Sequence, residues 1–144
     1  MTTACLSIHG WDHHDNEPQV LPVILTELTD TLDAFATDMG SEMNRITLVT
    51  MSEFGCRAWE NSSNGFDHGF GSFMFALGAG VIGGTVYGDW PGLAPANLVF
   101  TGDLDITTDY RTVLAELLSK RFGQDDFATV FPDWIPETEL GLFM

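Results

Sequence analysis

One long amphipathic repeat lies between two short apolar runs, and this order restricts the fold of the chain more than any other feature. Over residues 21–39, apolar side chains recur every three or four positions, which predicts a helix with Pro22 in its first turn and Gly40 at its end. Runs 4–8 and 46–51 are short and apolar, and the second is rich in β-branched residues, so both predict strands. Strand, helix and strand in this order are typical of an α/β protein.

The middle of the chain alternates short apolar runs with glycine-rich turns. Residues 73–77 predict a buried strand, and the glycine-rich run 78–84 predicts a turn after it. Residues 85–87 and 98–100 predict two further short extended segments. These segments add short strands to the expected α/β fold.

A second helix is predicted towards the C-terminus. It begins after Thr107 or Thr108, either of which can cap it, and it ends at Gly123. The acidic and aromatic tail 125–144 is expected to be irregular and to lie over the surface. The apolar stripe of the helix consists of Tyr110, Val113, Leu114, Leu117 and Leu118.

The composition fits one folded domain over residues 1–144 with an acidic surface. Apolar residues make up 44% of the chain, which excludes an intrinsically disordered protein. Twenty-one acidic residues against five basic ones give a net charge of −16, which repels nucleic acids and anionic membranes. No window reaches the roughly 18 consecutive apolar residues of a membrane span, and the first residues lack a secretory signal pattern. Such acidity fits either a cation-binding protein or adaptation to a salty medium.

Two polar clusters directly follow two of the predicted strands. The first, residues 9–16, follows run 4–8, and the second, residues 53–68, follows run 46–51. In α/β sheets, functional loops lie beyond the carboxyl ends of the strands. The two clusters are therefore expected at one edge of the sheet, facing each other.

The two clusters hold three carboxylates and two imidazoles that suit a metal site, namely Asp12, His14, Glu53, Asp67 and His68. This mixture favours Zn²⁺, Mn²⁺ or Fe over Mg²⁺ and Ca²⁺, which take oxygen ligands. Asp12 and His14 are two positions apart and point the same way on an extended backbone. Asp67 and His68 are adjacent and diverge on a strand, so both reach one centre only from a bent loop. The alternative is that these polar residues solvate loops, with His68 at the edge of the core.

Several other features are given no catalytic or cofactor role. Cys5 and Cys56 form no Cys-x-x-Cys pair and are expected to be small buried apolar residues, with one disulfide bridge between them as the alternative. The glycine pattern of residues 78–83 opens no amphipathic helix, so no nucleotide cofactor is predicted. His9 and His13 are expected to be structural or exposed rather than metal ligands.

A series of motifs in a fixed order carries a family resemblance. The motifs are Gly10-Trp11-Asp12-x-His14, Ser52-Glu53-Phe54-Gly55, Glu60-Asn61, Asp67-His68-Gly69, Gly83-Gly84, Tyr87-Gly88-x-Trp90-Pro91, Thr108-Asp109-Tyr110-Arg111 and Val130-Phe131-Pro132. Their order resembles the DUF1501 family over nearly the whole chain. Members of that family are similar to sulfatases and alkaline phosphatases, which are metal-dependent ester hydrolases with an α/β sandwich fold.

The resemblance implies a role for each candidate ligand. Asp12, His14 and His68 correspond to ligands of one metal ion. Glu53 corresponds to a ligand of a second metal ion. Asp67 is implied either as a further ligand or as a group that orients a ligand. Two metal ions would stabilise the attacking and leaving oxygens of an in-line displacement on a phosphoryl or sulfuryl group.

The resemblance also implies that the chain is part of a larger fold. The expected fold is the C-terminal half of an alkaline-phosphatase-like three-layer sandwich, with a mixed sheet and flanking helices. The segment with the nucleophile lies upstream of the matched motifs in the family, so this half is expected to be incomplete for catalysis and to pair with the missing half or with itself. Its expected substrate is a small anionic ester, whose oxyanion Arg57 contacts. Full-length members are expected to be exported, and the alternative function is a non-catalytic metal-binding or assembly module.

Overall fold

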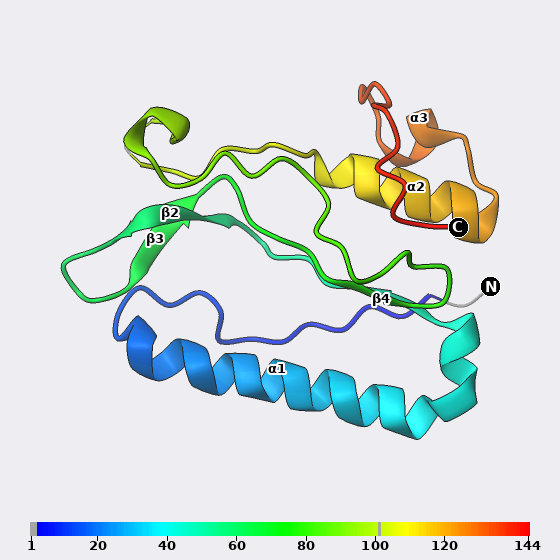
Figure 1. Cartoon of the computed structure of the whole chain (residues 1–144), viewed down its shortest axis with the longest axis horizontal. Helices are drawn as coiled ribbons and strands as arrows, with labels where there is room; N and C mark the ends of the chain where they lie inside the picture. Colours follow the sequence, from blue (N-terminus) through cyan, green and yellow to red (C-terminus); the bar gives the residue numbers. More distant parts are fainter. Residues whose placement is uncertain (1–2, 101) are drawn as a thin grey trace.

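The longest element is a helix of 23 residues, α1 (Glu17–Met39), which runs along one edge of the computed structural model (Figure 1). The structure describes residues 3–100 and 102–144. The helix confirms the predicted amphipathic repeat, and Gly40 ends it with a φ of 49° before the short 3₁₀ helix η1 (Gly40–Arg45). None of the helices in the described part of the chain combines the length and apolarity that a bilayer span requires.

The predicted start of this helix is wrong by four residues. The helix begins at Glu17, so Pro18 lies in its first turn and Pro22 lies in the second, where it removes one bond of the helix ladder. The hydroxyl of Thr26 donates to the carbonyl of Pro22 at 2.7 Å. The early start has a tertiary cause, because the carbonyl of Asn64 accepts the N–H of Glu17 at 2.8 Å.

The strands form two separate antiparallel pairs. The run 46–51 forms β1 (Thr47–Val49), which pairs with β4 (Ala76–Gly78). β2 (Gly55–Glu60) pairs with β3 (Phe66–Gly69) as a hairpin with a bulge. The chain is therefore an α/β protein, but its described strands form no mixed sheet. β1 and β4 have only three residues each and offer few ladder hydrogen bonds, and the two pairs form separate sheets.

Two of the predicted strands are absent or displaced. Run 4–8 has no regular structure, and Leu6 within it is 93% exposed. Only the last residues of run 73–77 join β4, while Phe73 and Phe75 are exposed. Residues 73–75 lie outside β4 because β1 pairs only with residues 76–78.

The two further extended segments also differ from the prediction. Residues 85–87 lie outside any strand, and in the run 98–100 only Val99 forms an isolated bridge, to Asp103. The short 3₁₀ helix η2 (Pro95–Asn97) comes just before this bridge. Pro95 has no N–H for a ladder, which favours a turn over a strand at this point.

The second predicted helix is confirmed as α2 (Tyr110–Phe122), but its cap is a different residue. Neither Thr107 nor Thr108 caps it. The carboxylate of Asp109 accepts the backbone N–H of Arg111 at 2.8 Å and so provides the cap. Aspartate is an effective cap because its carboxylate satisfies a free helix N–H and faces the positive end of the helix dipole.

The buried side of α2 is rotated from the predicted apolar stripe. Gly123 ends the helix in the left-handed region, as predicted, but Tyr110 is 51% exposed. The helix turns this side inwards because the end of the chain packs there. Its buried residues are Thr112, Val113, Ala115 and Glu116.

The core lies between α2, the β1–β4 pair and the C-terminal end of the chain. Val113, Leu142 and Phe143 are its buried members. The tail was predicted to lie over the surface, which is wrong for its last residues. Phe143 forms an isolated β-bridge with Val81, and its side chain enters the core. Earlier in the tail, α3 (Phe127–Val130) forms one short helical turn.

Both cysteines differ from the prediction of buried apolar residues. Cys5 and Cys56 are free thiols, and both are exposed. Cys5 lies in the irregular segment before α1, and Cys56 lies in β2. Cys5 is uncovered because run 4–8 does not become an inner strand.

A buried carboxylate holds the end of the chain in the core. Glu116 is 1% exposed, and its carboxylate accepts the backbone N–H groups of Leu140, Gly141 and Phe143 at 2.8, 3.1 and 2.8 Å. A buried charge is tolerated only when hydrogen bonds replace its water. These three bonds therefore fix where the tail turns inwards.

Replacing Glu116 by Ala should lower the free energy of unfolding by about 3 kcal/mol, because it leaves buried N–H groups without an acceptor. Urea denaturation followed by circular dichroism measures this change. The matched control is Glu139→Ala, which removes the surface pair with Lys120 and should cost less than about 1 kcal/mol. Equal losses in the two variants would contradict a structural role for Glu116.

Candidate metal centre

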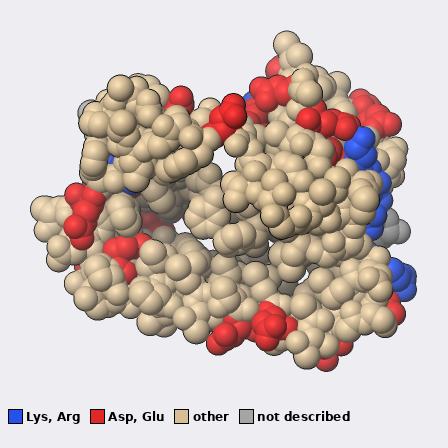
Figure 2. Space-filling model, in the orientation of Figure 1, with Lys and Arg blue, Asp and Glu red and all other residues tan. Residues whose placement is uncertain are grey.

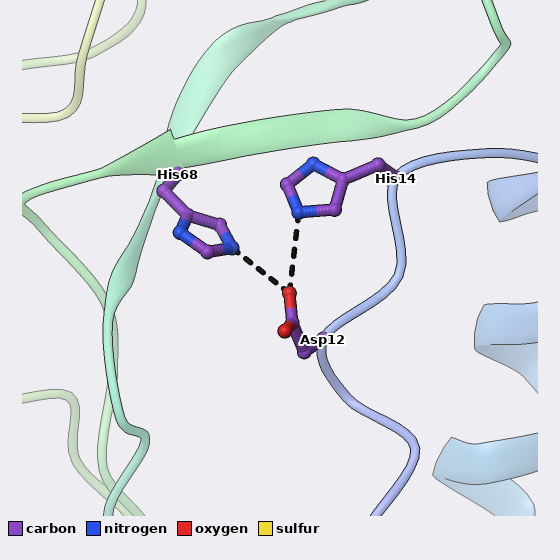
Figure 3. A group of neighbouring side chains, drawn as sticks. All are labelled: Asp12, His14 and His68. Atoms are coloured by element: carbon purple, nitrogen blue, oxygen red, sulfur yellow. Dashed lines mark hydrogen bonds and ion pairs between the residues drawn. The ribbon is translucent and has the colours of Figure 1, made fainter.

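Three side chains from two distant parts of the chain meet at one point (Figure 3). Asp12 and His14 lie on the irregular segment before α1, and His68 lies on β3. The Asp12 carboxylate oxygen Oδ1 lies 3.0 Å from Nε2 of His68 and 3.2 Å from Nε2 of His14. One ligand atom from each residue lies within 4.8 Å of the other two, and no other group of three such residues does so in the described parts of the chain.

The β2–β3 hairpin positions His68. Most of the predicted polar cluster 53–68 forms this hairpin rather than a loop beyond a strand. The ring of Phe54 stacks on the ring of His68, with centroids 3.7 Å apart and an angle of 19° between the planes. The His14 ring also lies close by, with its centroid 4.6 Å from that of the His68 ring. Stacking limits the rotation of His68 and directs its Nε2 towards Asp12.

Asp67 contacts His14 but is not one of the three residues of the group. Its Oδ1 lies 3.3 Å from Nδ1 of His14. A carboxylate on the second ring nitrogen of a metal-binding histidine fixes the ring orientation and leaves Nε2 for the metal. Asp67 and His68 are neighbours on β3 and were predicted to diverge, yet both lie beside His14, Asp67 through this bond and His68 through its ring.

Asn61 connects the two parts of the site, and it was not predicted as a functional residue. Its Nδ2 donates to the carbonyl of His14 at 2.9 Å and to Oδ1 of Asp67 at 3.1 Å. Its Oδ1 accepts the N–H groups of Ser63 and Gly65 at 2.8 and 3.1 Å. One carboxamide thus closes the hairpin turn and holds the segment of His14 against it. The run Asn-Ser-Ser-Asn-Gly is typical of such a side-chain-stabilised turn, and that signal could have identified Asn61.

Backbone contacts reinforce this connection. The N–H of Asn16 donates to the carbonyl of Ser63 at 3.1 Å, next to the contact between Glu17 and Asn64. A Cβ atom on Gly65 would lie 2.3 Å from the carbonyl carbon and oxygen of His14. Only glycine permits this close approach of the two backbones.

Glu53 and Arg57 lie outside the three-residue group. Glu53 is exposed at the turn before β2 and contributes no ligand atom to it. Arg57 lies in β2 and donates from Nε to Oδ1 of Asp103 at 3.0 Å, with Nη1 3.8 Å from Oδ2 of Asp67. Its guanidinium is thus already paired with two carboxylates.

The other two histidines stay out of the group. His13 pairs with Glu17 at 3.4 Å, and His9 lies exposed on the irregular segment before α1. Neither residue is among the three that converge.

The hydrogen bonds at the site favour a positive charge on His14, which lies between the carboxylates of Asp12 and Asp67. The hydrogen bond with Asp67 raises the pKa of His14, and the bond with Asp12 adds to this effect. The hydrogen bond with His68, followed by that with His14, lowers the pKa of Asp12. Hydrogen bonds from Asn61 and then His14 lower the pKa of Asp67. Both ring nitrogens of His14 therefore face carboxylates, an arrangement that stabilises the imidazolium form.

The group is open to solvent. The side chains of Asp12, His14 and His68 are 62%, 45% and 48% exposed. Water and solutes therefore reach the ligand atoms directly, and a metal ion placed among them keeps positions for further ligands.

A family model described as "Protein of unknown function (DUF1501)" matches residues 2–135 of the chain. No curated protein matches the chain, and no solved structure does so either. The matched range contains all three residues of the group and the hairpin that positions His68.

In metal-free protein, the imidazole of His14 should titrate above its ordinary pKa of 6.5, because Asp67 and Asp12 stabilise its protonated form. A raised pKa means that the stabilisation is complete below the unfolded pKa and is lost as the pH rises through the folded value. The pKa values of Asp12 and Asp67 are lowered, so the stability that these carboxylates contribute is lost as the pH falls. The contacts are thus strongest in mildly acidic solution.

An NMR titration of the histidine ring protons measures the pKa of His14 directly. Asp67→Asn should move the midpoint of His14 downwards, whereas Asp15→Asn, which changes a neighbouring exposed carboxylate, should leave it in place. A His14 midpoint that does not respond to Asp67→Asn would show that this contact does not form in solution.

Proposed function

Because the chain belongs to the DUF1501 family, we propose that its Asp12–His14–His68 group binds a divalent transition metal ion and is the metal-binding part of a sulfatase- or alkaline-phosphatase-like ester hydrolase. The family description gives no function. The proposal therefore depends on the chemistry of the group and on the resemblance of the motif order to those hydrolases.

The convergence of the three ligand atoms is the observation that carries the proposal. Asp12 and His68 are 56 positions apart in the sequence, and yet their polar atoms lie 3.0 Å from each other. The contact between Asn61 and His14 and the stacking of Phe54 hold both sides in place before any ion binds. Such preorganisation lowers the cost of assembling a metal site.

The ligand types support Zn²⁺, Mn²⁺ or Fe in preference to Mg²⁺ or Ca²⁺. Two imidazole nitrogens and one carboxylate oxygen are the donors that these transition metals accept, whereas Mg²⁺ and Ca²⁺ prefer oxygen alone. Three protein ligands with open positions are typical of catalytic metal ions. Asp67 then has the role of orienting His14, in agreement with its bond to Nδ1.

The proposed reaction is hydrolysis of a small anionic phosphoric or sulfuric ester. A bound divalent metal ion supplies Lewis-acid activation of the ester oxygen. Arg57 is the proposed contact for the oxyanion, which requires its guanidinium to exchange the longer contact, at 3.8 Å from Asp67, for the substrate. We propose that this chain is the metal-binding part of a larger enzyme. The larger enzyme would contain the sandwich fold, the nucleophile and a second metal ion.

A second candidate function is a non-catalytic module that binds one metal ion for assembly. Glu53 favours it, because this proposed ligand of a second metal ion belongs to no group of three such residues within the described parts of the chain. A single open site without a neighbouring metal ion stabilises fewer of the oxygens in an in-line displacement. Turnover measurements separate the two functions.

The change His14→Ala or His68→Ala should weaken binding of Zn²⁺ by at least about a hundredfold, because each variant removes one of three ligands. Isothermal titration calorimetry on protein that was first treated with a chelator measures this loss. His9→Ala is the matched control, since it removes an exposed imidazole outside the group. Zn²⁺ binding that is absent, or equal in all four proteins, would exclude the proposed metal centre.

The metal-loaded chain should hydrolyse aryl phosphates or aryl sulfates slowly if the open positions of the metal ion are functional. The release of the coloured phenolate, compared with the free metal ion in buffer, measures the rate. Turnover that disappears in His68→Ala supports the hydrolase. Intact Zn²⁺ binding without turnover would instead support the assembly module.

A further inference from the structure

A cavity of about 70 Å³ lies next to the β2–β3 hairpin and shares no residue with the Asp12–His14–His68 group. It forms where the chain just after β3 meets two later segments, residues 90–98 and 104–107. Its volume holds several water molecules. Pockets for nucleotides and similar ligands usually exceed about 300 Å³. The cavity therefore suits the edge of one small ring.

Hydrogen bonds hold the walls of this cavity in place. The N–H of Gly71 donates to the carbonyl of Leu104 at 2.8 Å and joins two of the three segments. In the third segment, the carboxamide of Asn97 donates to the carbonyl of Pro91 and closes the loop that follows Trp90. The cavity is thus formed before a ligand binds, which lowers the cost of binding.

The polar side chains that line the cavity keep hydrogen-bonding groups for a ligand. Ser72 accepts the hydroxyl proton of Ser52 at 2.9 Å, so its own proton remains available. Asp105 uses one carboxylate oxygen to accept the N–H of Ile106 at 2.9 Å, which leaves its second oxygen as an acceptor. Thr107 contributes a further hydroxyl. Donors and acceptors side by side match ligand hydroxyl groups, which both donate and accept.

Trp90 adds a large aromatic ring to this lining. It is 69% exposed, so most of its surface is free to cover a ligand. The face of an indole ring is slightly negative, and the carbon-bound hydrogens on one face of a pyranose ring are slightly positive, so the two faces attract each other. The ring next to the hydroxyl-binding groups therefore fits a flat ligand with one apolar face and polar edges.

The charge of the cavity disfavours ions of either sign. Asp105 is the only charged side chain among the described residues that line it, so no basic group is there to bind phosphate or sulfate. The net charge of −16 adds to the repulsion of anions, and acidic side chains are spread over the face that Figure 2 shows. A calcium ion takes six to eight oxygen ligands, and a single carboxylate holds it weakly. An uncharged ligand fits best.

We propose that this cavity binds one pyranose ring of a carbohydrate, with the apolar face of the sugar on Trp90 and its hydroxyl groups on Ser72 and Asp105. The site goes beyond the proposed metal centre, because it shares none of its residues and needs no metal ion. A free monosaccharide and the end of a longer glycan present the same ring. A ligand with about twelve non-hydrogen atoms should bind with a dissociation constant in roughly the millimolar range.

Nuclear magnetic resonance on the full wild-type chain, free of metal and labelled with ¹⁵N, tests the proposal. Methyl α-glucoside, methyl α-mannoside and methyl β-galactoside are the probes, each titrated separately. At least one should cause saturable shifts of the Trp90 indole N–H and of the Gly71 and Gly92 amides, which belong to the cavity. Maltohexaose is the arm for a longer glycan, and tighter binding of it would identify a glycan end as the ligand.

Trp90→Ala should weaken this binding at least about tenfold, and Trp90→Phe should retain part of it, because phenylalanine keeps an aromatic face. The matched control is Tyr110→Ala, since Tyr110 is 51% exposed but does not line the cavity. Circular dichroism verifies that each variant keeps its fold.

Three results would overturn the proposal. The first is a wild-type spectrum that no sugar changes at concentrations far above the millimolar range. The second is sugar binding that Trp90→Ala leaves as strong as before. The third is a set of shifts that calcium chloride or sodium phosphate causes and the sugars do not, which would assign the cavity to an ion.

Discussion

The contact between the hairpin turn and the segment before α1 is the interaction on which the candidate site depends. Asn61 donates to the carbonyl of His14, and the neighbouring turn carbonyls accept the first N–H groups of the helix. These bonds satisfy helix N–H groups that would otherwise lack partners. They also place His14 beside His68. The start of α1 and the geometry of the site therefore have one common cause.

The site and the core use charge in different ways. In the core, Glu116 is surrounded by backbone donors, so that its charge is stabilised without a cation. At the site, Asp12 and Asp67 flank His14 in the open, and protonation of the His14 ring supplies a positive charge between them. The first arrangement therefore supports the fold, while the second leaves its side chains accessible to solvent.

Local sequence patterns predicted the two main helices well. The repeat of α1 and the stop at Gly40 depend on residues within a few positions of one another, as does the stop at Gly123. The strands were harder to predict, because a strand exists only where a partner supplies ladder bonds. Run 4–8 found no such partner, and the apolar end of the tail found a place in the core instead of on the surface.

The sequence by itself determined the candidate ligands, since Asp12, His14 and His68 are residue types that transition metals accept. Only the tertiary structure decided that Glu53 stays outside the group and that Asp67 supports His14. The physical reason is that these outcomes depend on how the hairpin packs against a segment more than fifty positions away, and no local pattern encodes that distance.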